Sequence, residues 1–235
     1  MKYSIVIPCY NEEDNLPQLI ATIEEMAKGR DIEFVLVENG SKDGSYELMK
    51  SLVKDKPFIK IVKVDVNQGL GFGICQGIKE ANGDFVGWIH ADLQTPREDI
   101  EKFLNYLDMT DPNHLIMVKA TRHNRTLVDY FFTNAMAIFC SLLFRTLLYD
   151  VQAVPVIVSN DLFKSMKVIP HGFAFDMFMY WQARKKGFDV KRLPVRILKR
   201  EKGNSSWNTG LLARIRLSRY MAHSAFEMVK GNYDV

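Results

Sequence analysis

Four short polar segments of the sequence each come directly after a run of apolar and β-branched residues. They are Pro8–Glu13, Glu38–Ser45, Asn67–Gly73 and His90–Pro96. In the last segment, Asp92 and Gln94 stand two residues apart and offer the hard oxygen ligands that Mg²⁺ or Mn²⁺ takes beside a diphosphate. The glycines of the third segment resemble a phosphate-binding loop only loosely, because neither a P-loop nor G-x-G-x-x-G is present.

Each segment also has an ordinary structural interpretation. Asn11 can cap a helix, Glu38–Ser45 has the composition of a turn, and Asp92 can open the helix that follows Pro96. One segment alone is therefore weak evidence for chemistry. Four segments that each follow a predicted strand indicate one composite site, because ligands bind beyond the carboxyl ends of parallel strands.

The elements that must position these segments alternate in hydrophobic period along the first 110 residues. Strands are predicted at 3–7, 33–37, 59–64 and 84–89, and helices between them at about 12–28, 44–54, 70–82 and 97–109. Strand–helix–strand units of this length form right-handed crossovers and a parallel sheet. The predicted fold class is thus α/β, with a Rossmann-like, mostly parallel sheet flanked by helices.

The pattern is looser after residue 110. It predicts strands at 115–118, 154–158 and 189–197, and helices at 127–149, 174–187 and, with amphipathic character, 209–229. No segment is rich enough in Pro, Gly or Ser to mark a linker. We therefore expect one domain over 1–235, made of a first half at 1–110, a second half at 111–208 and a C-terminal helix at 209–235.

Composition excludes several classes of protein. The 235 residues are 47% apolar and 25% charged, which suits a folded domain and excludes a disordered or fibrous chain. Three cysteines make no paired framework and no signal peptide is recognised, so we expect a reduced, cytoplasmic setting. Between Arg184 and Arg219, twelve Lys or Arg stand against two acidic residues, although the net charge is only +3. This excess is either a solvated basic face or a contact for phosphates or an anionic membrane, and no nucleic-acid-reading module is visible.

Two helical segments bear on membrane contact. The apolar run at 130–144 is interrupted by polar residues and is shorter than the ~20 residues that span a bilayer, which favours a buried or interfacial helix. The helix at 209–229 carries Arg214, Arg216 and Arg219 among apolar residues. Such a pattern is typical of a helix with one face on the core, or of one that lies in the headgroup region of an anionic membrane.

As a set, the polar segments resemble the donor half of a family 2 glycosyltransferase with the GT-A fold, and most nearly the polyprenol-phosphate and dolichol-phosphate sugar transferases. The resemblance extends from Tyr3 to about Trp207. It implies that 1–110 binds a nucleoside-diphosphate sugar and 111–208 the acceptor. His90–Gln94 is similar to the family's metal motif D-A-D-L-Q, which implies Mg²⁺ or Mn²⁺ on Asp92 and Gln94. The residues that the resemblance assigns to the donor are Pro8, Tyr10, Asn11, Glu12, Glu38, Asn39, Ser41, Asn67, Gly69, Leu70, Ala91 and Asp92.

The resemblance also implies the reaction, an inverting displacement of the nucleoside diphosphate from the anomeric carbon of the sugar. Arg122 lies in a stretch similar to the family's G-S-R segment and Arg200 in one similar to R-x-x-G-x-S, so both are assigned to phosphate charge. Asp176 is assigned as the base if the acceptor is a hydroxyl. A phosphate acceptor needs no base, and Asp176 then only orients the site.

Three departures from the family's pattern bear on the substrates. His90 stands in place of the first metal-motif Asp, Asn39 in place of an Asp that often reads the base, and Asp129 near an Arg of the lipid-phosphate enzymes. The expected acceptor is therefore a lipid-linked or glycan intermediate of surface polysaccharide synthesis, met at the inner face of the membrane by a peripherally associated enzyme. A polyprenyl-phosphate sugar synthase and a non-catalytic nucleotide-sugar-binding partner remain alternatives. A nucleotidyltransferase is disfavoured, because the first strand is not followed by a Gly-rich basic loop.

Overall fold

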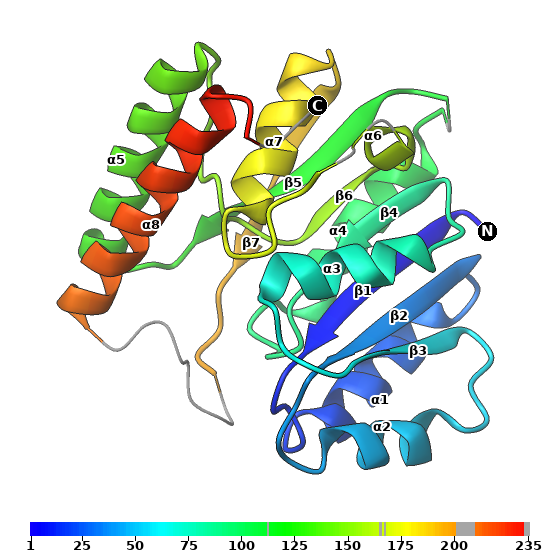
Figure 1. Cartoon of the computed structure of the whole chain (residues 1–235). Helices are drawn as coiled ribbons and strands as arrows, with labels where there is room; N and C mark the ends of the chain where they lie inside the picture. Colours follow the sequence, from blue (N-terminus) through cyan, green and yellow to red (C-terminus); the bar gives the residue numbers. More distant parts are fainter. Residues whose placement is uncertain (112, 165, 167, 201–209, 233–235) are drawn as a thin grey trace.

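The computed structural model describes residues 1–111, 113–164, 166, 168–200 and 210–232. Seven strands form one sheet in the order β3-β2-β1-β4-β6-β5-β7 (Figure 1). The strands are β1 (Tyr3–Cys9), β2 (Ile32–Asn39), β3 (Ile59–Val64), β4 (Phe85–Trp88), β5 (Ile116–His123), β6 (Val156–Ser159) and β7 (Asp189–Arg196). All neighbours are parallel except β6, which runs antiparallel to both β4 and β5. The predicted mostly parallel sheet is confirmed.

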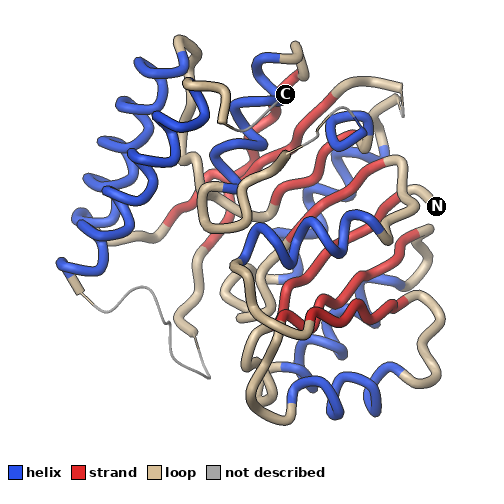
Figure 2. Tube along the Cα trace, in the orientation of Figure 1, coloured by secondary structure: helices blue, strands red, loops and turns tan. Residues whose placement is uncertain are grey.

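Helices cover both faces of the sheet (Figure 2). They are α1 (Leu16–Ala27), α2 (Ser45–Val53), α3 (Leu70–Lys79), α4 (Arg97–Asp108), α5 (Leu127–Phe144), α6 (Asp161–Lys164), α7 (Phe175–Lys185) and α8 (Leu211–Val229). Side chains of α1, α2 and α4 pack with one set of strand residues, and those of α3, α5, α7 and α8 with the alternate set. This division follows from the strand period of two, which sends successive side chains to opposite faces.

The central strands are apolar on both faces because both faces are covered. All seven residues of β1 and all eight of β2 are buried, as expected for parallel strands between two helical layers. The chain places β2 on one side of β1 and β4 on the other. Such a reversal of strand order opens a crevice at the carboxyl ends of the strands, where α/β proteins bind ligands.

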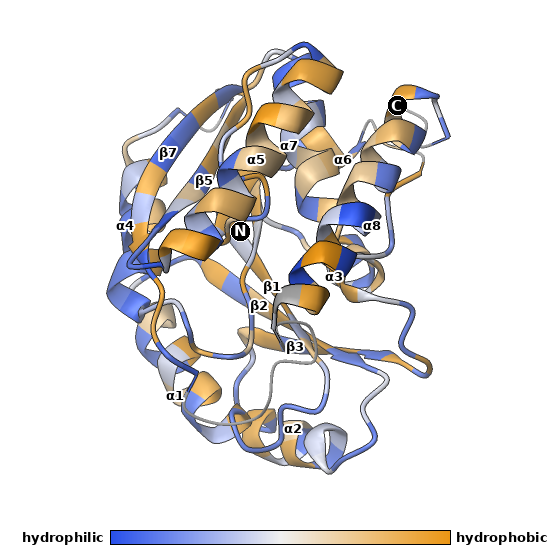
Figure 3. Ribbon diagram, turned by 90° about the vertical axis from the view of Figure 1, so that its left-hand side faces the viewer, coloured by the Kyte–Doolittle hydropathy of each residue, from blue (hydrophilic) through white to orange (hydrophobic). Residues whose placement is uncertain are grey.

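Helices α5 and α8 pack against each other beside the second half of the sheet (Figures 1 and 3). Among the described residues, α5 is the one helix that is long and apolar enough to cross a membrane by length and composition, with a mean hydropathy of 1.6 over 18 residues. Only 17% of it is buried, so it is a surface helix rather than a core helix. It ends at Phe144, earlier than the predicted 149, because Arg145 adopts a left-handed conformation with φ 52°.

Candidate active site

The loops after β1 and β2 are joined by hydrogen bonds between predicted donor residues. Asn11 has a left-handed φ of 55°, and its backbone N–H donates to Oγ of Ser41 at 3.1 Å. The backbone N–H of Lys42 donates to Oδ1 of Asn11 at 2.8 Å, and that of Ser41 donates to Oε1 of Glu38 at 2.5 Å. Asn11, Glu38 and Ser41 are therefore brought together at the carboxyl edge of the sheet.

Two other predicted donor residues lie at the end of β1. Pro8 is a buried member of the strand, opposite Val37 of β2, so it supports the edge from within the sheet. Tyr10 is the first exposed residue beyond it, with 38% of its surface accessible. An exposed aromatic ring at this edge can stack on a planar base.

The loop before α3 is held in a conformation that requires glycine. The backbone N–H of Gly69 donates to Oδ1 of Asn67 at 2.8 Å, and its carbonyl accepts from Nδ2 of Asn39 at 3.2 Å. Gly69 has φ 108°, and a Cβ there would lie 2.6 Å from the carbonyl oxygen of His171. Leu70 then begins α3. Asn39 is buried, with 3% exposure, so in this structure its side chain fixes the Gly69 loop rather than facing solvent.

The turn after β4 carries the predicted metal residues. Oδ1 of Asp92 accepts the backbone N–H of Gln94 at 3.1 Å, and Leu93 between them has φ 57°. Nε2 of Gln94 donates to the carbonyl of Leu198 at 3.0 Å, and the N–H of Leu198 donates to the carbonyl of Gln94 at 2.8 Å. Ala91 is buried beneath this turn. Gln94 thus ties the turn to the segment after β7.

In that segment, Arg200 meets the loop after β1. Nη2 of Arg200 donates to Oε1 of Glu12 at 2.7 Å, and Nδ2 of Asn15 donates to the other carboxylate oxygen at 2.5 Å. Burial raises the pKa of Glu12, Arg200 and His90 oppose that rise, and Asp92 adds to it. Glu12, His90, Asp92 and Arg200 therefore interact electrostatically at one end of the sheet. The remainder of the predicted motif, 201–207, lies outside the described residues.

The fit of a divalent metal can be judged from the side chains of this edge. Among the described residues, no group of three or more His, Cys, Asp or Glu is arranged to hold a metal ion by itself. Mg²⁺ is commonly bound by one or two carboxylates and by substrate phosphates, and the half-buried Asp92 fits that mode. In Gln94 the amide nitrogen Nε2 donates to the carbonyl of Leu198, so the amide oxygen Oε1 is the atom that could reach a metal ion.

Arg122 lies in a different environment from Arg200. Its guanidinium makes a bidentate ion pair with the carboxylate of Asp150, including a contact between Nη2 and Oδ1, and Nε lies 3.0 Å from Oδ1. The backbone N–H of Arg122 donates to Oδ2 of Asp150 at 3.0 Å. Burial would raise the pKa of Asp150, but the charge and hydrogen bonds of Arg122 hold it below its usual value. The pair is therefore a fixed, charged feature of the wall of a pocket.

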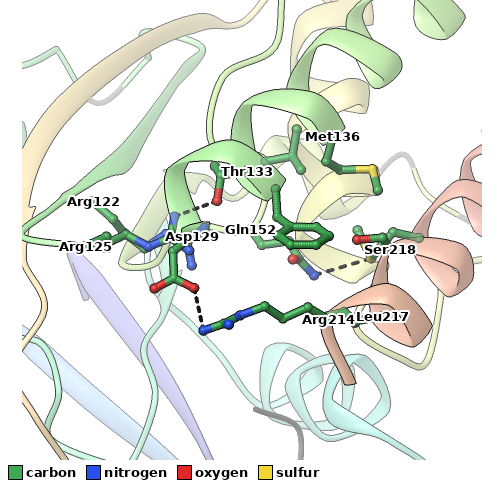
Figure 4. Close-up of a pocket in the computed structure, with 12 residues that line it drawn as sticks. Arg122, Arg125, Asp129, Thr133, Met136, Gln152, Arg214, Leu217 and Ser218 are labelled. Atoms are coloured by element: carbon green, nitrogen blue, oxygen red, sulfur yellow. Dashed lines mark hydrogen bonds and ion pairs between the residues drawn. The ribbon is translucent and has the colours of Figure 1, made fainter. Parts of the chain in front are cut away.

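This pocket opens between α5, α8 and the end of β5, with a cavity of about 210 Å³ (Figure 4). Its lining residues are Arg122, Arg125, Asp129, Phe132, Thr133, Met136, Val151, Gln152, Arg214, Leu217, Ser218 and Met221. Nη2 of Arg214 pairs with Oδ1 of Asp129 at 3.0 Å, and Nη1 of Arg125 donates to Oγ1 of Thr133 at 2.6 Å. Burial would raise the pKa of Asp129, but Thr126 and Arg214 hold it low. Three arginines, Arg122, Arg125 and Arg214, therefore lie in the same pocket as a wall of apolar side chains.

Sequence reasoning missed most of this pocket. Arg125 belongs to none of the motifs that the sequence offers. Arg214 was predicted, with Arg216 and Arg219, on a helix that either packs its apolar face on the core or lies in the headgroup region of a membrane. In the structure Arg214 points into the pocket, whereas Arg216 and Arg219 are exposed. The one signal was Asp129, an acid where the lipid-phosphate enzymes have an arginine, and in the structure this half-buried carboxylate pairs with Arg214.

Asp176 is buried beside the carboxyl end of β4. It is 4% exposed, at the first turn of α7, and its Oδ1 accepts the indole N–H of Trp88 at 2.7 Å. Trp88 is the last residue of β4, four positions before Asp92. The hydrogen bond of Asp176 is thus to β4, the strand that leads into the turn with Asp92.

Comparisons with known proteins agree with this architecture. The family model "Glycosyl transferase family 2" matches residues 4–158, more than half of the chain. Undecaprenyl-phosphate 4-deoxy-4-formamido-L-arabinose transferase of Pseudomonas fluorescens is 41% identical over 105 residues, 43% of this chain and 31% of that protein. Dolichol-phosphate mannosyltransferase of Pyrococcus furiosus is 36% identical over 104 residues, 44% of this chain and 29% of that protein. The aligned region spans less than a third of either relative's length.

Solved structures give the same fold at low identity. Glucosyl-3-phosphoglycerate synthase from Mycobacterium tuberculosis, crystallised with Mn²⁺, UDP and glucosyl-3-phosphoglycerate, superposes with a TM-score of 0.72 and 16% identity. The match covers 98% of this chain and 80% of the synthase chain. With the loops at the carboxyl edge of the sheet and the family match over residues 4–158, the chain belongs to glycosyl transferase family 2 and has the GT-A fold.

Proposed function

We propose that this glycosyltransferase moves a sugar from a nucleoside diphosphate to the phosphate of a lipid-linked acceptor, with inversion at the anomeric carbon. The observation that supports a lipid-linked phosphate as acceptor is the pocket between α5 and α8, where Arg122, Arg125 and Arg214 lie beside an apolar wall. Guanidinium groups suit phosphate recognition, and the apolar wall suits a hydrocarbon chain. The names of the two relatives, which act on undecaprenyl phosphate and dolichol phosphate, support the same class.

Asp129 does not argue against a phosphate acceptor. Its charge is already matched by Arg214 of α8 at 3.0 Å, so α8 supplies the basic group that α5 lacks at this position. The carboxylates of Asp129 and Asp150 leave three arginines in the pocket with a net excess of positive charge. When a phosphate binds, its oxygens take the place of part of the Asp129 and Asp150 contacts to the three arginines.

The donor binds, in this proposal, at the loops after β1, β2 and β4. Tyr10 and the Asn11–Ser41 contact border the nucleoside, and Arg200 lies at the diphosphate with Glu12 holding its guanidinium. Asp92 would hold Mg²⁺ or Mn²⁺, which when bound stabilises negative charge on the leaving diphosphate. Mn²⁺ and UDP in the mycobacterial synthase support this assignment.

The reaction balances without a protein base. An oxygen of the acceptor phosphate forms a bond to the anomeric carbon, and the bond from that carbon to the diphosphate oxygen breaks with its electron pair. Arg200 compensates the charge that grows on the leaving group. Asp176, buried against Trp88, orients the β4 edge and accepts no proton in this scheme.

Peripheral membrane contact at the cytoplasmic face follows as part of the same proposal. Leu127, Phe131, Ile138 and Leu142 recur along one face of α5 and are between 62% and 87% exposed. An apolar stripe of this kind suits the boundary between headgroups and acyl chains. The ribbon of α5 is coloured largely as hydrophobic (Figure 3), and the same helix lines the acceptor pocket.

The proposal is tested by offering the protein a panel of nucleotide sugars with Mn²⁺ and either a short isoprenyl phosphate or the matching isoprenol. Transfer to the phosphate but not to the alcohol is expected. Arg125→Ala and Arg214→Ala should raise KM for the acceptor about tenfold or more, because each removes a charged hydrogen-bond donor. Arg216→Ala, an exposed arginine on the same helix, is the matched control. Equal use of the neutral alcohol would overturn the phosphate acceptor.

A further inference from the structure

Lys119 is a lysine in the protein core that the proposed reaction does not use. It lies on β5, has 0% exposure, and points to the sheet face covered by α7. Its Nζ donates to the carbonyl of Ala153 at 2.6 Å and lies 5.6 Å from the centre of the Tyr180 ring. Removing an ammonium group from water is energetically costly unless neighbouring charges and hydrogen bonds compensate it.

Charged and titratable groups face Lys119 from every element packed around it. They are Arg122 on β5, Asp150 in the turn before β6, Asp176 and Tyr180 on α7, and Arg192 on β7. Burial lowers the pKa of Lys119 to about 7, with both carboxylates opposing that fall and both arginines adding to it. The group therefore stands at the centre of a buried cluster of mixed charge.

Two parts of the proposed active site meet in this cluster. The turn from Asp150 to Ala153 is held by β5 twice, through Lys119 at Ala153 and through Arg122 at Asp150, and it contributes Val151 and Gln152 to the pocket wall. On the other side, Asp176 holds the indole of Trp88, from which the chain continues to the Asp92 turn.

We propose that Lys119 is a positioning residue for sugar transfer: its ammonium fixes the Asp150 turn that orients Arg122 in the acceptor pocket and balances the carboxylate of Asp176. The inference rests on the proposed function and goes beyond it, because Lys119 touches neither substrate in that scheme. When the charge is lost, Asp150 and Asp176 lose a shared counter-charge. Acceptor use is then weakened more than donor binding.

The experiment compares the wild-type protein with Lys119→Met, which keeps the length of the side chain and removes both charge and hydrogen bond. The values of kcat and KM for a short isoprenyl phosphate and for the donor are measured from pH 6 to 9. Because the acceptor phosphate titrates in both proteins, the difference between them isolates Lys119. At pH 6 we expect kcat/KM for the acceptor to be about tenfold lower in Lys119→Met. The difference should narrow toward pH 9, where only the hydrogen bond to Ala153 still distinguishes the two proteins, with KM for the donor unchanged throughout.

Lys119→Gln keeps a hydrogen-bond donor for Ala153 without the charge, so it should behave as Lys119→Met does in the pH profile. It also serves as the test variant if Lys119→Met fails to fold. A difference that is independent of pH, or a loss confined to KM for the donor, would overturn the inference.

A readout independent of activity separates this inference from the proposed function. The indole ¹⁵N–H signal of Trp88, assigned by loss of one of the three tryptophan signals in Trp88→Phe, should move with pH near 7 in the wild type and not in Lys119→Met. A titrating signal without any transfer to isoprenyl phosphate would overturn the proposed acceptor but support the coupling. A signal that responds to neither pH nor the substitution would overturn the inference whatever the activity.

Discussion

Arg200 and Glu12 are 188 positions apart in the sequence, yet Nη2 of Arg200 donates to Oε1 of Glu12 at 2.7 Å. The contact joins the segment after β7 to the loop after β1, and it leaves both side chains largely buried, with 21% and 12% of each exposed. A cation fixed in this way needs no reorganisation when charge develops on a leaving diphosphate.

Replacing Arg200 by Ala should therefore lower kcat by about 10²-fold or more, the usual cost of losing a preorganised charge-stabilising group. KM for the donor should change less. The measurement is steady-state transfer at saturating acceptor, and Lys199→Ala, the exposed neighbouring cation, is the control. If Arg200→Ala kept wild-type kcat and raised only KM, Arg200 would contribute to donor binding alone.

The metal assignment is tested at the turn after β4. Asp92→Ala should abolish metal-dependent turnover of the donor, because Asp92 is the carboxylate of that turn, whereas His90→Ala should keep a measurable fraction since His90 is exposed. Hydrolysis of the nucleotide sugar is measured with Mn²⁺, with Mg²⁺ and in EDTA. Full activity of the Asp92 variant in EDTA would exclude the assignment. A wild-type protein that binds the donor but never turns it over would instead favour the non-catalytic alternative.

Asp176 distinguishes the two kinds of acceptor. If a phosphate attacks, Asp176→Asn should be only mildly impaired, because the amide oxygen of Asn can still accept the indole N–H of Trp88. If a hydroxyl attacks, loss of a proton acceptor typically costs ~10²–10⁴-fold in rate. Turnover and donor affinity are measured together. A large loss of turnover with unchanged donor affinity would restore the base role and contradict the phosphate acceptor.

Much of the first half of the chain, residues 1–110, could be predicted from sequence because neighbouring residues along the chain determine its strands and loops. Short apolar strands followed by polar loops predict both the sheet and its functional edge, and the structure brings Asn11, Glu38 and Ser41 together there. Burial is harder to predict. The side chain of Asn39, which the resemblance assigns to the donor, is buried and donates to the carbonyl of Gly69, a packing relationship that no periodicity encodes.

The second half of the chain could be predicted less well, because the pocket between α5 and α8 depends on how two distant helices pack. An amphipathic pattern in α8 indicates that one face of the helix is apolar, but it does not predict which arginine points into the pocket. Arg214 does so because Asp129 of α5 lies 3.0 Å away. The buried position of Lys119 was equally hidden, since the predicted strand ends at 118 and lysine is almost never fully buried.

Asp150 should make stability sensitive to acid. Its pKa in the folded protein lies below the usual value because Arg122 outweighs the effect of burial, so the folded state binds its proton more weakly than the unfolded state does. The stabilisation is present above about pH 4 and is lost as pH falls through the folded pKa. The free energy of unfolding of the wild type and of Asp150→Asn is measured by urea denaturation at pH 7 and pH 3. The destabilisation caused by the substitution should be largest at pH 7 and shrink at pH 3, and an equal effect at both values would contradict it.

The membrane contact is tested by co-sedimentation with anionic liposomes at low and high salt. Leu127, Phe131 and Leu142 are 87%, 68% and 75% exposed on one face of α5, so replacing all three by Ser should remove most of the binding. Met109→Ser, at an exposed apolar residue after α4 on the opposite face of the sheet, is the control and should bind as the wild type does.

The basic residues of α8 provide a second, electrostatic arm of the same test. Arg216→Glu with Arg219→Glu should weaken binding and flatten its salt dependence, because both side chains are exposed. Arg214→Ala should leave liposome binding intact, since that arginine points into the pocket toward Asp129. Unchanged binding in the α5 variant together with a strong effect of the α8 charges would mean that the protein is held by electrostatics alone, and absence of binding at low salt would favour an acceptor met in solution.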